Sequence, residues 1–310
     1  MAASFITPLN QEPTLPKDTI ALALHGGAGA RPGRDYGRET IHMRAMVEVA
    51  RDRLLAGADA LDVAVETVAA LEASGLYVAG RGAAANPDGD YELDACLMDG
   101  ATLRAGAVAA LQGFQSPIQA ARAVMERTPH VLLAGAGAAA FARAQGLEEI
   151  DDLAAWFTPL SDNIAAPASG GLAHGTVGCV VRDRGGRLAA ATSTGGTYGK
   201  MPGRVGDTPI PGAGAWADSA VAVSSTGLGE YFLRTATAAQ IAFRMRFGGQ
   251  ALDAAARAAL AEIKALGGDG GVICVDADGQ IAMPYVTGGM KRAALYPGGR
   301  IVAGAFEDLS

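Results

Sequence analysis

Short apolar runs alternate with glycine-rich turns along the first half of the chain. The run from Ile20 to Leu24 is continuous and leads into the loop HGGAG, a pattern that predicts a buried strand. Residues 37–74 carry apolar side chains at helical spacing on both sides of Gly57, which predicts two helices. The segments predicted next are two strands within 92–110 and helices over 117–127 and 137–146.

The pattern changes over residues 159–175, which are rich in Pro, Ser, Gly and Ala without a clear period. Such a composition is typical of an exposed linker. From Thr176 onward, two apolar segments separated by the turn DRGG predict a β-hairpin. The remaining predicted elements are a strand over 221–225, helices over 230–244 and 251–265, and strands within 271–305.

The order of these elements indicates the fold class. Strands occur in adjacent pairs and helices in adjacent pairs, which favours two stacked sheets between helix layers over a doubly wound parallel sheet. The chain has 310 residues, enough for one large layered domain or two modest ones. Half of the residues are apolar and only 18% are charged, so we expect a sizeable core. Aromatic residues are few, and the interior is therefore expected to consist of closely packed Ala, Val and Leu.

Charge and cysteine usage restrict the partners and the compartment. The net charge of -7 argues against nucleic-acid or anionic-membrane binding and favours a small polar partner. No apolar stretch approaches the roughly 20 residues that cross a bilayer, and the first 18 residues lack the features of a secretory signal. Cys96, Cys179 and Cys274 form no CxxC pair, so we expect buried, reduced thiols. These features together predict a cytoplasmic protein.

Common catalytic and cofactor motifs are weak or absent. Gly135, Gly137 and Ala140 have the GxGxxA spacing of a dinucleotide-binding loop, but no strand with a ribose-binding acid follows them. Close helix packing is the alternative explanation for these residues. The sequence contains no Walker loop, HExxH or GxSxG motif. The chemistry must therefore lie elsewhere.

The boundary between Gly175 and Thr176 offers a nucleophile. A threonine hydroxyl needs a nearby base, and a threonine at a chain terminus carries that base as its own α-amine. An α-amine titrates near 7.7 to 8.0, whereas an amide nitrogen has no useful basicity. Cleavage before Thr176 would thus create the base. The alternative is a flexible loop that precedes an ordinary β-branched strand residue.

Several ordered motifs favour the catalytic interpretation. They are GTVG at 175–178, TSTGG at 192–196, PGRVGD at 202–207 and SSTGLGE at 224–230, together with HGGAG, ELDACLMDG and MERTPHV earlier in the chain. From about residue 20 to 295 the chain resembles the plant-type asparaginase and isoaspartyl peptidase family of N-terminal-nucleophile hydrolases, which are threonine peptidases.

The resemblance implies an α/β fold of four layers, αββα, with two stacked and mainly antiparallel sheets. It implies one domain over residues 1–310 that cuts itself into 1–175, with a flexible linker about 158–175, and 176–310. Two copies of the processed pair would assemble. The implied activity is hydrolysis of isoaspartyl (β-aspartyl) dipeptides and, less efficiently, of L-asparagine to L-aspartate, with no organic cofactor.

The resemblance also implies roles for individual residues. Thr176 would be the nucleophile, and Thr194 would hydrogen-bond it and tune its protonation. Thr226 and Gly227 would form the oxyanion hole, where a strand ends just before a helix and leaves donors for developing negative charge.

Substrate recognition is implied for a second group of residues. The guanidinium of Arg204 suits the α-carboxylate of the substrate, and the carboxylate of Asp207 suits its α-ammonium. On sequence alone, RVGD could instead be a surface ion pair in a turn. Gly229 either allows close substrate approach or simply begins a helix.

A loop that holds a structural sodium ion through main-chain carbonyls is a further implied feature. The matching positions are Leu71, Glu72, Ser74, Tyr77, Ala79 and Arg81. Carbonyl ligation does not depend on the side chain, so the sequence leaves this site open.

The chain departs from the family pattern at two positions. Val78 and Val286 stand where the family commonly has Asn, and the first of these normally lies near the active site. The departure puts efficient hydrolysis of free asparagine, and full maturation, in question. The alternatives are a glycosylasparaginase-like hydrolase, an uncleaved non-catalytic binding homologue, and a nucleotide-binding module that uses the GxGxxA loop.

Overall fold

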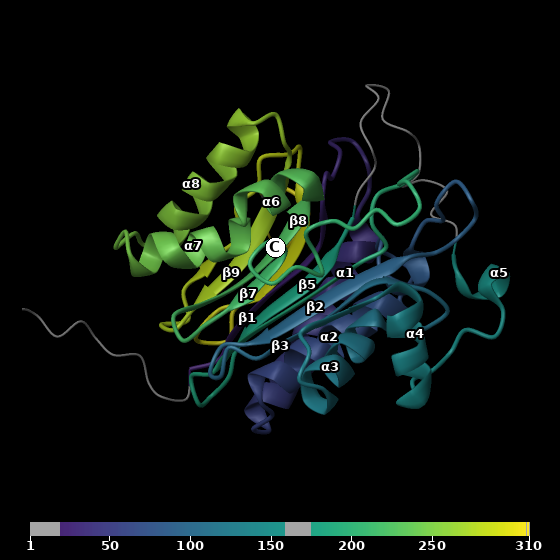
Figure 1. The fold of residues 1–310 in the computed structure, drawn as a ribbon. Helices are drawn as coiled ribbons and strands as arrows, with labels where there is room; N and C mark the ends of the chain where they lie inside the picture. Colours follow the sequence, from purple (N-terminus) through teal and green to yellow (C-terminus); the bar gives the residue numbers. More distant parts are fainter. Residues whose placement is uncertain (1–18, 159–174, 308, 310) are drawn as a thin grey trace, which may run out of the picture.

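Two facing β-sheets, each covered by helices on its outer side, make up the molecule (Figure 1). The computed structural model describes residues 19–158, 175–307 and 309, so the predicted linker lies almost wholly outside the described residues. The α/β fold class and the two sheets between helix layers are confirmed.

The larger sheet has eight strands in the order β12-β11-β1-β5-β6-β2-β3-β4. All of its strand pairs are antiparallel except β3 with β4. The bounds of its strands are β1 Ala21–Ala28, β2 Leu93–Asp99, β3 Ala105–Leu111, β4 Leu132–Ala134, β5 Val177–Arg182, β6 Leu188–Thr194, β11 Met290–Leu295 and β12 Ile301–Gly304.

The smaller sheet has four antiparallel strands in the order β10-β9-β8-β7. These are β7 Ala215–Ala217, β8 Val221–Gly227, β9 Gly270–Asp276 and β10 Ile281–Ala282. The helices are α1 Gly37–Leu55, α2 Ala60–Ala73, the 3-10 turn η1 Gly80–Gly82, α3 Pro117–Arg127, α4 Gly135–Ala144, α5 Leu153–Trp156, α6 Gly229–Thr235, α7 Thr237–Arg246 and α8 Leu252–Ala265. Helices α1 to α3 pack on the larger sheet, and α7 and α8 pack on the smaller one.

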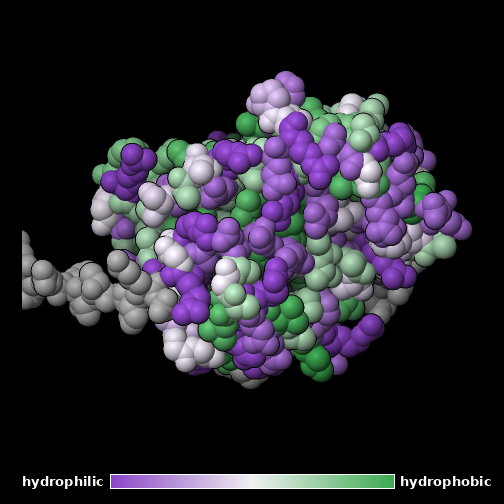
Figure 2. All heavy atoms as spheres, turned by 90° about the horizontal axis from the view of Figure 1, so that it is seen from below, coloured by the Kyte–Doolittle hydropathy of each residue, from purple (hydrophilic) through white to green (hydrophobic). Residues whose placement is uncertain are grey.

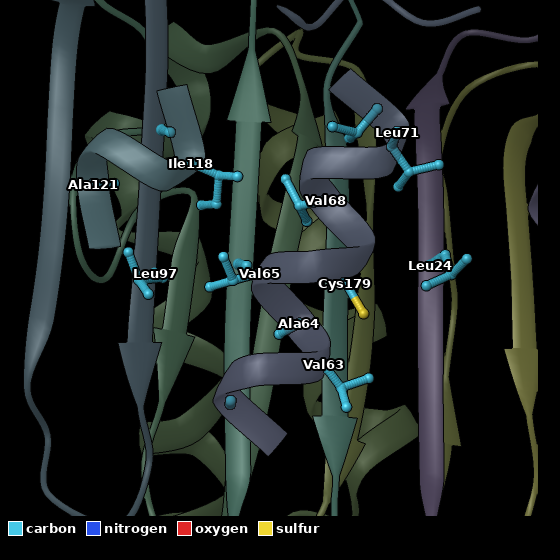
Figure 3. Close-up of a cluster of buried hydrophobic side chains, with 14 of the residues drawn as sticks. Leu24, Val63, Ala64, Val65, Val68, Leu71, Leu97, Ile118, Ala121 and Cys179 are labelled. Atoms are coloured by element: carbon cyan, nitrogen blue, oxygen red, sulfur yellow. The ribbon is translucent and has the colours of Figure 1, made fainter. Parts of the chain in front are cut away.

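Strand β1 illustrates why the apolar runs are continuous. Leu22 and Leu24 face the core under the helices, whereas Ala21 and Ala23 face the second sheet. Both sides of the strand are buried, so no polar alternation is needed. Figure 3 shows α2 lying over the larger sheet, with its axis roughly along the strands and with Val65 and Val68 directed at them. The small residues expected from composition therefore fill the space between the sheets.

The structure differs from the predicted elements at short or irregular segments. Strands β4 and β7 have only three residues each and were not predicted. The single helix expected over 230–244 is two helices, because Ala236 adopts a left-handed conformation with φ 48°. Ala236 is neither Gly nor Asn, the residues that commonly adopt this conformation, so the break could not be predicted from its residue type.

The hairpin of β5 and β6 lies at the centre of the larger sheet. Strand β5 pairs with β1, and β6 pairs with β2, so strands from before and after Thr176 are interleaved. The hairpin was predicted from sequence, and β5 begins one residue after the threonine. Thr176 is thereby fixed at the end of a central strand.

The surface mixes polar and apolar side chains. Figure 2 shows the helix side of the larger sheet, where hydrophilic residues predominate and apolar ones are scattered among them. Among the described helices, none has both the length and the apolar character needed to span a bilayer. Cys96, Cys179 and Cys274 are buried free thiols, as expected.

Candidate active site

A narrow pocket opens where β5, β6 and β8 end beside the loop that joins β6 to β7. The residues lining it are Gly175, Thr176, Thr194, Gly196, Thr197, Arg204, Gly206, Asp207, Thr208 and Gly227. Its free volume is about 10 Å³, room for about one water molecule. The sequence motifs therefore meet in space, although they are spread over more than fifty residues.

The two threonines expected to act together are in contact. The Thr176 hydroxyl donates to the Thr194 hydroxyl at 3.4 Å. Thr194 in turn donates to the carbonyl oxygen of Gly175 at 2.6 Å and accepts from the amide of Gly196 at 2.9 Å. Thr194 thus touches both sides of the Gly175–Thr176 bond. In the uncut chain the nitrogen of Thr176 is an amide and cannot act as a base.

Opposite charges face the same pocket. Arg204 Nε donates to Glu230 Oε1 at 2.9 Å, so its ion-pair partner is Glu230 rather than Asp207. Arg204 Nη2 and Asp207 Oδ2 are buried without a hydrogen-bond partner among the described residues. Buried polar groups are normally paired, so these two atoms present an open donor and an open acceptor to a ligand.

Burial raises the pKa of the Asp207 carboxyl to about 7, while the nearby Arg204 guanidinium opposes the shift. A neighbouring carboxyl, Asp94, is also fully buried, and its pKa is raised to about 6 for the same reason. Lys200 is buried beside it and donates to the carbonyl oxygen of Glu92 at 2.6 Å. Burial lowers the pKa of Lys200, and the carboxylates of Asp94 and Glu92 work against that shift. These buried charges tie the loop that carries Arg204 and Asp207 to strand β2.

The predicted oxyanion residues lie at the end of β8. Gly227 lines the pocket, whereas Thr226 is fully buried behind it and accepts from the amide of Ala28 at 3.2 Å. Its hydroxyl proton remains available for donation. Gly229 begins α6, and a Cβ there would lie 2.7 Å from Asp207 Oδ1 and 3.0 Å from Arg204 Nη2. Gly229 therefore begins the helix, as one alternative held, and its lack of a side chain lets α6 begin against Asp207 and Arg204; close approach of a substrate stays a prediction.

A buried polar chain behind Thr176 was not predicted from the sequence. His25, Ser224 and Thr192 are fully buried and are linked to one another, and His25 Nδ1 lies 3.2 Å from the carbonyl oxygen of Thr176. Each of these residues is the first of a recognised motif: Ser224 of SSTGLGE, Thr192 of TSTGG and His25 of HGGAG. The motifs therefore marked the residues, but the contacts among the three side chains depend on strand pairing, which the motifs alone do not give.

Comparison with known proteins identifies the family. Residues 18–301 match the sequence pattern of the family described as asparaginase. The chain belongs to the asparaginase family. It is 46% identical to an isoaspartyl peptidase of Salmonella typhimurium over 93% of this chain and 98% of the relative, and 44% identical to an isoaspartyl peptidase of Escherichia coli over 93% and 96%. A plant-type L-asparaginase of Pyrobaculum calidifontis is 40% identical over 89% of this chain and 97% of that protein.

Val78, where the family pattern commonly has Asn, lies beside the predicted cleavage bond. A Cβ added to Gly175 would lie 2.7 Å from the side chain of Val78, and the Val78 carbonyl accepts from the amide of Gly195 at 2.9 Å. An apolar side chain thus contacts the residue before the predicted nucleophile. Val286 instead packs against the core under α7 and α8, and its amide donates to the carbonyl oxygen of Gly270 at 2.8 Å.

The loop expected to hold sodium in the asparaginase family is tightly coiled. A Cβ on Gly82 would lie 2.0 Å from the carbonyl oxygen of Tyr77 and 3.2 Å from that of Gly75, so carbonyl oxygens converge there. The carbonyl of Arg81 already accepts two hydrogen bonds from Thr158, at 3.0 and 3.3 Å. The carbonyl of Leu71 likewise accepts from the amide and the hydroxyl of Ser74, at 3.4 and 2.7 Å, and that of Tyr77 accepts from the amide of Ala79 at 2.8 Å. A carbonyl oxygen has two lone pairs, so the sodium site stays a prediction that Tyr77 and Gly75, whose oxygens converge, fit best.

The GxGxxA segment does not form a dinucleotide unit. Strand β4 before it is short and largely exposed, and α4 leads back to an isolated bridge between Phe114 and Glu149 rather than to a parallel strand. A Cβ added to Gly135 or Gly137 would meet no atom of the described chain within 4 Å, so close packing does not explain these glycines either. Helix α4 uses Ala138 and Ala142 for packing.

Proposed function

We propose that this chain cleaves itself before Thr176 and then hydrolyses isoaspartyl dipeptides and, less efficiently, L-asparagine. The observation that carries the proposal is the composition of the pocket. Its free volume in the uncut chain is too small for a substrate, so the proposal requires that Gly175, which lines the pocket, moves away after cleavage. The Thr176 hydroxyl shares the pocket with an open guanidinium donor of Arg204 and an open carboxylate oxygen of Asp207. An α-amino acid head supplies the complementary carboxylate and ammonium, and the names of the relatives agree with such substrates.

Self-cleavage begins with the same hydroxyl that later attacks the substrate. Thr176 Oγ1 adds to the carbonyl carbon of Gly175, and the bond from that carbon to the Thr176 nitrogen breaks as the nitrogen takes up a proton. The hydrogen bond from Thr194 to the Gly175 oxygen polarises this carbonyl. Water then hydrolyses the resulting ester, which frees the Gly175 carboxylate, the Thr176 hydroxyl and its α-amine.

Turnover uses the new amine as the base. It accepts the proton of Thr176 Oγ1, which attacks the β-carbonyl carbon of the aspartyl group. Donors at Thr226 and Gly227 stabilise the oxyanion, and one such donor is worth about 3 kcal/mol in the transition state. The bond to the leaving amine breaks, that amine takes up the proton, and water releases L-aspartate from the acyl-enzyme.

The proposal extends to assembly, location and ions. Two processed pairs associate, the protein acts in the cytoplasm on small molecules or dipeptides, and the chemistry uses no organic cofactor. A structural sodium ion binds main-chain carbonyls around Tyr77, where carbonyl oxygens converge. Replacing sodium chloride with choline chloride should lower the melting temperature, and an unchanged melting temperature would contradict the ion.

Intact-mass measurement and a panel of β-aspartyl dipeptides beside L-asparagine test the function. We expect two fragments that meet at Gly175 and Thr176, and Thr176→Ala should remain uncut and inactive. Normal turnover by that variant would reject the nucleophile. Turnover of glycosylated asparagine in preference to dipeptides would favour the glycosylasparaginase alternative, and an uncut, inactive parent chain would indicate a binding homologue.

A further inference from the structure

The nucleophile loses a restraint when the chain is cut. Before cleavage, Thr176 is held by peptide bonds on both sides. Afterwards only its carbonyl side is attached, and strand β5 begins one residue later, at Val177. The amine and the hydroxyl of Thr176 must nevertheless keep one geometry, because a displacement of 1 Å can cost about 100-fold in rate.

A buried side-chain network contacts that remaining side. His25 Nδ1 lies 3.2 Å from the carbonyl oxygen of Thr176, and His25 Nε2 lies 2.8 Å from Ser224 Oγ. Ser224 Oγ lies 2.7 Å from Thr192 Oγ1. The members come from β1, β8 and β6, so the network spans both sheets. All three side chains are fully buried.

The partners determine the proton positions. A carbonyl oxygen only accepts, so Nδ1–H must donate to Thr176. Burial lowers the pKa of His25 to about 3, which keeps the ring neutral, and Nε2 must then accept from the Ser224 hydroxyl. The Ser224 proton is then used, so Thr192 must donate to Ser224 Oγ at 2.7 Å, a shorter contact than that of its hydroxyl with the other available acceptor, the carbonyl oxygen of Gly214, at 3.3 Å. Each hydroxyl and each ring nitrogen in the network thus has a defined role as donor or acceptor.

The backbone is shaped to admit this network. A Cβ on Gly178 would lie 2.0 Å from Ser224 Oγ and 2.4 Å from His25 Nε2, so only glycine fits at this position of β5. The pairing of His25 with Gly178 places the ring beside the start of β5.

We propose that His25, held in one tautomer by Ser224 and Thr192, is a positioning residue that anchors the carbonyl of Thr176 and so aims its hydroxyl and amine. The inference rests on the proposed function. It predicts that the Nδ1–H donor matters for cleavage and for kcat, whereas substrate binding at Arg204 and Asp207 is unaffected.

Two isosteric substitutions separate the roles of the two ring nitrogens. The amide nitrogen of Asn occupies the place of Nδ1, whereas that of Gln reaches the place of Nε2. We expect His25→Asn to keep most of the cleavage rate and kcat. His25→Gln and His25→Leu should lose about 100-fold in kcat per cut chain, with KM changed less than about twofold.

Three measurements are made on each full-length variant: the fraction cut by intact mass, kcat and KM for a β-aspartyl dipeptide, and the melting temperature. If Gln and Leu variants do not cut at all while the Asn variant does, the anchoring role is supported. If the Gln variant matches or exceeds the Asn variant in kcat and in the fraction cut, the inference is wrong. It is also wrong if kcat falls in all three variants in proportion to their melting temperatures. An uncut, inactive parent chain would refute the proposed function and this inference together.

Discussion

Asp207 illustrates how a closed pocket controls a single carboxyl. Its side chain is buried, its Oδ2 has no partner among the described residues, and its pKa is raised to about 7. The proposed ligand brings an ammonium that needs the ionised form of this group. Protonation of Asp207 therefore competes with ligand binding at pH values close to neutral.

We predict that L-aspartate, measured as a competitive product inhibitor, binds more weakly as the pH falls below about 7. A group whose pKa is raised is protonated over a wider range on the acid side, so the inhibition constant should rise up to about tenfold per pH unit below that pKa. Asp207→Asn should bind weakly at every pH without this slope. A parent enzyme whose inhibition constant is flat from about one pH unit above to one below that pKa would contradict the role of Asp207.

Val78 places an apolar side chain beside the Gly175–Thr176 bond. Its side chain contacts Gly175, and the family pattern commonly has Asn, a hydrogen-bonding residue, in place of this valine. We predict that Val78→Asn raises the ratio of asparaginase to dipeptidase turnover by about two- to tenfold, the effect of one net hydrogen bond of about 0.5–1.5 kcal/mol. Val78→Ala is the control, because it removes bulk without adding polarity. An equal rise in both variants would assign the effect to space rather than to hydrogen bonding.

At the scale of elements, periodicity predicted long segments well and short ones poorly. Helices α1 to α3 and the hairpin of β5 and β6 lie where their apolar spacing placed them. Strand β7 has three residues, too few to establish a period, and it exists because it pairs with β8. The break between α6 and α7 depends on how both helices pack. The local sequence pattern gave no indication of that packing.

Ala236 at that break provides a test of backbone strain. The residue is exposed and has φ 48°, a conformation that costs a residue with a Cβ about 1 kcal/mol relative to Gly. Ala236→Gly should therefore raise the melting temperature by about 2 °C. Ala261→Gly, at an exposed position inside α8, should lower it by a similar amount. Both changes are measured by calorimetry in the uncut Thr176→Ala chain, and a loss of stability at position 236 would show that the left-handed turn is not strained.

At the scale of the molecule, the site is assembled by pairings between distant segments. The motifs predicted Thr176, Thr194, Arg204, Asp207 and Gly227, and the structure brings them to one pocket. The motifs did not predict the contact between His25 and Ser224, which are 199 residues apart, because it arises only when β1 and β8 lie in facing sheets. Short sequence motifs thus predicted which residues line the pocket. They did not predict contacts between segments that are distant in the sequence.

The same interleaving of strands determines whether the two fragments of the proposed cleavage would stay together. Strand β5 lies between β1 and β6, and β6 pairs with β2, so residues on either side of Thr176 share one hydrogen-bonded sheet and one core. We predict that the fragments 1–175 and 176–310 remain together in native buffer and separate only in denaturant. Native mass spectrometry beside a denaturing gel measures this, with the uncut Thr176→Ala chain as the matched control. Release of either fragment under native conditions would mean that the strand pairing across the cut is not maintained once the Gly175–Thr176 bond is broken.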